Sequence, residues 1–148
     1  MQIKKILAPL FLITTIGFTQ NTKSPKEIFE QKCQMCHYTQ MPTTKEQNRL
    51  MGGPTIGIVM KGLVLTLDAM HDNLNDKMLK KKSVEFMADY IFYPERKKAN
   101  CEDIVFERFN MMPSLKGYIT KEELNRVLPW VYDTYKPNKI GENWVANQ

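Results

Sequence analysis

Two cysteines separated by two residues and followed at once by a histidine constrain this chain more than any other feature. The segment is Cys33-Gln34-Met35-Cys36-His37. On a helical turn, residues three apart lie on one side, so two thiols can add to the two vinyl groups of a porphyrin while the next imidazole turns under the iron. In an exported protein this C-x-x-C-H pattern is typical of covalent haem c attachment. We therefore expect one haem c held by Cys33 and Cys36, with His37 binding the iron through Nε2.

The amino terminus has the pattern of an export signal. Lys4 and Lys5 precede an apolar run from Ile6 to Phe18, which is about thirteen residues and short of the roughly 20 needed to span a bilayer. We predict that residues 1–20 are a signal peptide and that residues 21–148 form a single domain. The expected location is the periplasm, with membrane association only if the signal stays uncleaved.

The charge of the chain does not favour a nucleic-acid partner. The full sequence has 21 basic and 16 acidic side chains. Loss of Lys4 and Lys5 with the signal leaves 19 basic against 16 acidic side chains, so the formal net charge falls from +5 to +3. The run Lys80-Lys81-Lys82 fits the solvated face of a helix better than a docking patch. We therefore predict no nucleic-acid binding.

Apolar spacing predicts an all-α fold of three to five helices joined by long loops. One helix begins at Ser24-Pro25 and runs into the cysteine motif, because serine favours a helix cap and proline the first helical position. A second helical pattern starts at Asn75 and ends before Pro94. A short helix is expected around Glu102 to Phe109.

The carboxyl-terminal part of the sequence predicts one more helix. Thr120 and Glu123 form a capping box in front of an apolar stripe of helical spacing, made up of Leu124, Val127, Leu128, Val131 and Tyr135. Pro129 interrupts this stripe. We therefore expect a kink near Asn125 to Leu128, or two short helices in place of one straight helix.

The segment from Met41 to Thr66 is predicted to be a long loop. It contains two prolines and four glycines and shows no sustained helical periodicity. A short turn is expected near Thr66 to His71. Such a stretch needs a group to wrap around, which agrees with a bound haem.

The second axial ligand of a six-coordinate haem should be a methionine or the remaining histidine. The chain has ten methionines and two histidines. Met112 is the strongest candidate, because Pro113 stiffens the chain directly after it and both residues lie between two predicted helices. Met111 and His71 are the alternatives.

Two other uses of the cysteines compete with haem attachment. A dithiol redox site at Cys33 and Cys36 needs a thioredoxin-like alternation of strands and helices, which the sequence lacks. A zinc ion could instead bind Cys33, Cys36 and Cys101 with either His37 or His71, although the spacings are irregular. In the haem interpretation Cys101 is the odd thiol, and we expect it to be a small buried side chain.

The order of five features along the chain resembles the small monohaem class I cytochromes c. These features are the helix ending in the cysteine motif, the Gly53-Pro54 loop, the helix ending at Tyr93-Pro94, the Met112-Pro113 loop and the capped helix from Thr120. The resemblance implies a cytochrome c-like domain wrapped around one haem. It also implies that the Pro54 carbonyl accepts a hydrogen bond from His37 Nδ1, and that Phe29 contacts the last helix at Val127, Leu128 and Val131.

These features together predict an exported monohaem electron carrier that is not itself an enzyme, although it could be a subunit of an oxidoreductase complex. With His37 and Met112 on the iron, no position stays open for a substrate. The expected partners are redox proteins that meet an exposed haem edge through small, transient interfaces. The alternatives are a haem subunit or small-ligand sensor with an open or labile sixth position, and a zinc-bound interaction module.

Overall fold

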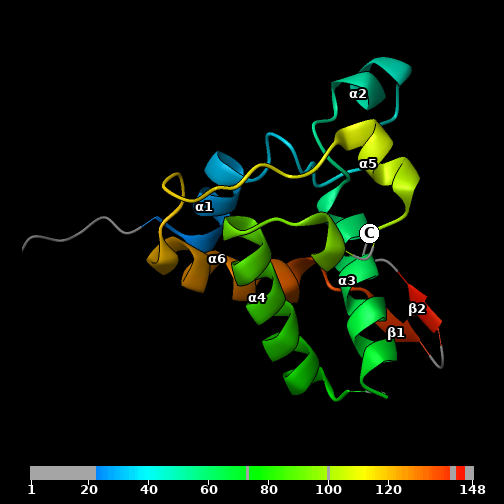
Figure 1. Ribbon diagram of the computed structural model, residues 1–148, viewed down its shortest axis with the longest axis vertical. Coiled ribbons are helices and arrows are strands. Elements are labelled where there is room, and N and C mark those ends of the chain that lie inside the picture. Colours follow the sequence, from blue (N-terminus) through cyan, green and yellow to red (C-terminus); the bar gives the residue numbers. More distant parts are fainter. Residues whose placement is uncertain (1–22, 73, 100, 141–142, 146–148) are drawn as a thin grey trace, which may run out of the picture.

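The computed structural model describes residues 23–72, 74–99, 101–140 and 143–145, and within these ranges the protein is mostly helical (Figure 1). Six α-helices exceed the three to five that the sequence predicts. The elements are α1 (Pro25–Lys32), α2 (Lys45–Leu50), α3 (Ile56–Met70), α4 (Asp76–Phe92), the 3₁₀ turn η1 (Arg96–Lys98), α5 (Asp103–Phe109), α6 (Lys121–Tyr135), β1 (Asn138–Ile140) and β2 (Asn143–Val145). The two strands pair antiparallel.

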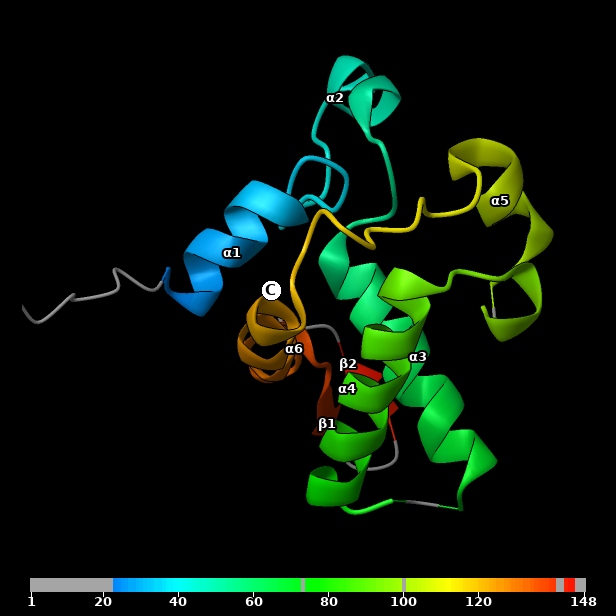
Figure 2. The same ribbon diagram turned by 60° about the vertical axis from the view of Figure 1, so that its left-hand side comes forward.

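Helix α6 lies at the centre of the fold. Figure 2 views it nearly end-on, between α1 on one side and the α3–α4 pair on the other. Four residues of the predicted stripe, Leu124, Val127, Leu128 and Val131, are buried together with Tyr132, whereas Tyr135 is half-buried. Burial of this stripe from both sides supplies most of the stabilisation of α6, because tertiary packing outweighs intrinsic propensity in helices of this length.

Helix α1 brings the cysteine motif against this core. Ser24 and Glu27 form a capping box at its start. Ile28 and Phe29 are almost fully buried, and the Phe29 ring centroid lies 5.7 Å from that of Trp130 and 5.6 Å from that of Tyr135. Phe29 also shares the core cluster with Val127, Leu128 and Val131, so the expected contact between the first and last helices is confirmed.

The predicted loop from Met41 to Thr66 is wrong. Helix α2 and most of α3 occupy it. Gly57 and Gly62 suggested a loop, yet both lie inside α3, where a Cβ would meet no other atom within 4 Å. Each glycine costs a helix roughly 1 kcal/mol relative to alanine, but complete burial of Met60 and Val64 offsets that cost.

Helix α6 runs without a break through Pro129, so the expected alternative of two short helices is also wrong. Proline has no backbone N–H to donate to the carbonyl of Asn125. Leu128 before the proline and Val131 after it are both buried, which holds the two halves in one helix. The predicted capping box of Thr120 and Glu123 is confirmed.

The predicted signal peptide, residues 1–20, lies outside the described residues. Among the described residues, no helix has the length and apolar character required to cross a bilayer.

Candidate functional site

The cysteine motif continues the end of α1 as a tight turn. Cys33 is the carboxyl-terminal cap of the helix, and its carbonyl accepts hydrogen bonds from the backbone N–H groups of Cys36 at 3.1 Å and His37 at 2.9 Å. All three cysteines of the chain carry free thiols. Burial raises the pKa of Cys33 to about 11, with a smaller contribution from the charge of Cys36. The thiol of Cys33 is therefore protonated at neutral pH.

The imidazole of His37 is held by a proline carbonyl. Its Nδ1 lies 2.8 Å from the Pro54 carbonyl oxygen, which is the hydrogen bond that the family resemblance implies. A carbonyl only accepts, so Nδ1 carries the proton and Nε2 keeps its lone pair. Burial lowers the pKa of His37, and the bond to Pro54 opposes this only in part. A neutral ring with a free Nε2 is the form that binds a metal ion.

Two glycines allow the chain before Pro54 to pack against the motif. A Cβ at Gly53 would lie 3.3 Å from the Cys36 carbonyl oxygen and 3.3 Å from His37 Cε1. One at Gly52 would lie 3.2 Å from Cys36 Sγ. The sequence indicated these glycines only as loop formers, whereas the structure uses the missing side chains to bring Pro54 within reach of His37.

The segment from Tyr38 to Ile56 forms a long loop whose two ends meet at the site. The Ile56 N–H donates to the Tyr38 carbonyl at 3.0 Å, which joins the ends of the loop beside His37 and Pro54. Helix α2 lies within it and buries none of its own residues, although Thr44 caps its start by accepting from the Gln47 N–H. The loop thus returns the chain to the motif, and α3 begins directly after it.

The Met112 segment, residues 110–118, runs from α5 back toward α1 and passes beside the loop that follows α1 (Figures 1 and 2). Met112 is half-buried, while Met111 is 46% exposed, so Met112 is the more enclosed of the two candidate ligands. Asn110, where α5 ends, has a φ of 58° and turns the chain into this segment. The segment has no regular structure up to Ser114.

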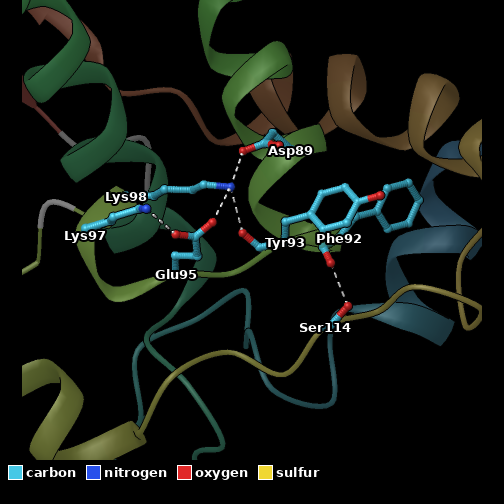
Figure 3. Close-up of polar contacts among 7 residues, drawn as sticks. All are labelled: Asp89, Phe92, Tyr93, Glu95, Lys97, Lys98 and Ser114. Carbon is cyan, nitrogen blue, oxygen red and sulfur yellow. Dashed lines mark hydrogen bonds and ion pairs between the residues drawn. The ribbon is translucent and has the colours of Figure 1, made fainter.

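This segment is fastened to α4 just after Met112. Ser114 Oγ donates to the Phe92 carbonyl at 2.7 Å, as Figure 3 shows, and the Leu115 N–H donates to the Ile91 carbonyl at 3.0 Å. Lys98 Nζ donates to the next carbonyl, that of Tyr93, at 3.0 Å, and is held by Asp89 and Glu95. These bonds satisfy carbonyls that the end of a helix leaves without partners.

A second attachment joins the same segment to the end of α1. Lys32 Nζ donates to the Tyr118 carbonyl at 2.7 Å and lies 4.1 Å from the Tyr118 ring centroid. Tyr118 Oη donates to the Gln31 carbonyl at 3.3 Å. Because Gln31 and Lys32 directly precede Cys33, the Met112 segment is tied to the helix that carries the cysteine motif.

The structure does not gather the other predicted ligand sets. His71 is exposed at the far end of α3, which begins beside Pro54 and is about 22 Å long at 1.5 Å per residue. It is therefore remote from His37. Among the residues that the structure describes, no group of three or more histidine, cysteine and acidic side chains is placed to hold a metal ion, so the four-ligand zinc set is not assembled.

Cys101 is exposed, and the expectation that it is buried is wrong. It lies between η1 and α5, and neither of these elements contributes a buried residue. The usual burial of a free cysteine reflects packing in a core, which this connection does not enter.

Comparison with known proteins adds one relative. A protein of Aquifex aeolicus (strain VF5), described as an uncharacterized protein, is 27% identical over 150 residues that cover 95% of this chain and 91% of the relative. No family model matches the chain, and no solved structure matches it.

Proposed function

We propose that this protein is an exported monohaem c-type cytochrome with a cytochrome c-like fold, which carries electrons between redox partner proteins. Cys33 and Cys36 attach the haem, and His37 and Met112 bind the iron. The observation that carries this proposal is the His37 imidazole, held by the Pro54 carbonyl at 2.8 Å immediately after two free cysteines. A bond from the far ring nitrogen to a backbone carbonyl is how proteins orient a histidine ligand and strengthen it as a donor.

The motif offers the groups that a covalent haem requires, which are two free thiols and one oriented imidazole. The backbone at Gly52 and Gly53 fills the side next to Cys36, where no side chain could be accommodated without movement. Cys33 and Cys36 would hold the haem through two thioether bonds, each formed by addition of S–H across one vinyl group, with sulfur on one carbon and hydrogen on the other, so no oxidant or reductant would be needed. Pro54 keeps Nδ1 protonated, which leaves the Nε2 lone pair for the metal.

The Met112 segment fits the role of the opposite ligand. It is attached to α4 by Ser114 and Leu115 and to α1 by Tyr118, so the chain that directly follows the thioether is held to two helices. When bound, the haem supplies a one-electron couple between ferric and ferrous iron. His37 would be held by Pro54 and Met112 by the chain that follows it, and a thioether ligand would favour the ferrous state of a bound haem relative to a second histidine.

Haem staining after denaturing electrophoresis tests the covalent attachment. The wild-type protein and the Cys101→Ala variant should stain equally, because Cys101 is exposed and lies outside the motif. Cys33→Ala and Cys36→Ala should each lose most of the stain. Unstained wild-type protein, produced where haem c is made, would overturn the proposal.

A reduced-minus-oxidised spectrum and exposure of the reduced protein to carbon monoxide test the ligation. A carrier with both axial positions filled should show a low-spin spectrum and bind carbon monoxide slowly or not at all. Rapid binding would instead indicate the alternative of an open or labile sixth position. Amino-terminal sequencing of the protein from the periplasmic fraction tests export, and a mature chain beginning near residue 21 is expected.

A further inference from the structure

A hollow between α2 and α5 brings two arginines together. It measures about 330 Å³ and is lined by Asn48, Arg49 and Met51 from the α2 side and by Arg108 and Phe109 from α5. Met51 directly precedes the two glycines that pack against Cys36 and His37. The hollow therefore adjoins the candidate site along the chain.

The residues that line this hollow include no acidic side chain to balance the positive charge of its two arginines. Of the five described residues that line it, two are arginines and none is acidic. Within the described chain neither Arg49 nor Arg108 pairs with a carboxylate, whereas Arg96 on the neighbouring η1 pairs with Asp103. Two arginines that line one hollow without an acidic neighbour in its walls raise its potential and attract an anion.

Arg108 is already positioned for such a contact. Its Nη2 donates to the Asn48 carbonyl at 3.3 Å and also to the Asn48 side-chain oxygen, and its guanidinium carbon lies 4.6 Å from the Phe109 ring centroid. Both hydrogen bonds use the same nitrogen and neutral acceptors, so the positive charge is retained and further N–H donors remain. Held in place in this way, Arg108 loses less entropy on binding an anion than a free side chain would.

The walls indicate what kind of anion fits. Met51 and Phe109 line the hollow together with the two arginines, and the Phe109 ring lies beside the Arg108 guanidinium. Arginine recognises planar carboxylates through paired hydrogen bonds. An anion with a carboxylate on an apolar body matches both parts of the hollow.

We propose that the hollow between α2 and α5 binds the carboxylate of an apolar compound through Arg49 and Arg108. Two sources share this chemistry: a propionate of the haem itself, which rests on the proposed function above, and a separate small carboxylic acid, which does not. Both place the carboxylate between the same two arginines.

The first arm of the test titrates the reduced, ¹⁵N-labelled protein with butanoate and follows the Nε–Hε signals of the arginines by nuclear magnetic resonance. A separate acid as the source predicts saturable shifts of the Arg49 and Arg108 signals, and no shift with equal amounts of 1-butanol. In Arg49→Gln the affinity for butanoate should fall about tenfold, the effect of one charge-assisted hydrogen bond. Arg126→Gln, which removes an arginine of α6 outside the hollow, should bind as the wild type does.

The second arm measures the midpoint potential against pH. A propionate in the hollow predicts no response to butanoate, and a pH-dependent step that moves upward by about one pH unit in Arg49→Gln, because loss of the cation raises the pKa of the carboxyl group. Arg126→Gln should leave the step in place.

With these two arms, the carboxylate site can fail its test independently of the proposed haem attachment. Haem staining decides the proposed function alone, and the butanoate arm reads the arginines whether or not haem is present. A response of Arg49 and Arg108 in either arm supports the carboxylate site. Absence of any butanoate response together with an unmoved potential step, or with no haem to measure, overturns it.

Discussion

The two sides of the candidate site are held in different ways. On the His37 side, the ring is fixed by a carbonyl 17 residues further along the chain, and the backbone before it is packed so closely that a Cβ at Gly52 or Gly53 would require its neighbours to shift. On the Met112 side, the segment is irregular and is attached by a few exposed hydrogen bonds to α4 and α1. Close packing resists displacement more strongly than exposed hydrogen bonds, so the Met112 side should be the first to yield.

Removal of Met112, the proposed second iron ligand, should have the largest effect. In Met112→Ala we expect complete loss of the sulfur-to-iron charge-transfer band of the oxidised protein, because the substitution removes the sulfur at this position. Visible absorption spectroscopy measures the band. The matched control is Met111→Ala, which removes the more exposed neighbour and should leave the band unchanged. A band that survives in Met112→Ala would show that another residue binds the iron.

Filling the close contact on the His37 side should have the next largest effect. Gly53→Ala places a methyl group 3.3 Å from a backbone carbonyl and from the imidazole, and such overpacking costs about 1–3 kcal/mol. Gly57→Ala, in open space inside α3, should instead stabilise the protein by about 0.5–1 kcal/mol. Denaturant unfolding of the two variants measures both values. Equal effects of the two substitutions would contradict the close packing described for Gly53.

Loosening the Met112 segment should have a smaller effect. Ser114→Ala removes the bond to the Phe92 carbonyl, worth about 1 kcal/mol or less at an exposed position. The charge-transfer band should then disappear at a lower denaturant concentration than in the wild type, before the helices unfold. Ser83→Ala is the control, because that buried hydroxyl of α4 has no hydrogen-bond partner among the described residues. If the band and the helices of Ser114→Ala are lost together, the segment is not held independently.

The smallest expected effect is measured on the haem-free protein, where no iron occupies Nε2, and is a dependence of stability on pH that comes from His37. Burial lowers the pKa of this imidazole in the folded protein, so below about pH 6.5 the unfolded chain binds a proton that the folded chain does not. The free energy of unfolding should therefore be fully retained above that pH and should decrease as the pH falls through it. Urea unfolding at a series of pH values measures this slope. His71→Asn, which changes an exposed histidine, should show the wild-type slope, and a slope that survives in His37→Asn would assign it to another group.

Much of the helical framework could be predicted from local sequence. Ser24-Pro25, Asn75 and Thr120 cap helices where predicted, because a capping side chain bonds to backbone groups within three residues of itself. Helix α3 could not be predicted in this way. Its glycines weaken the local signal, and its stability comes from burial against α4 and α6, elements that follow later in the chain.

The sequence by itself determined the chemistry offered at Cys33, Cys36 and His37, and the resemblance supplied Pro54 as the partner of His37. Only the tertiary structure decided that Gly52 and Gly53 admit Pro54 to that position, that His71 lies a helix length away, that Cys101 is exposed, and that Arg49 and Arg108 share a hollow. The physical reason is range. A motif or a cap acts through neighbours along the chain, whereas close approach, burial and charge convergence depend on segments that meet only after folding.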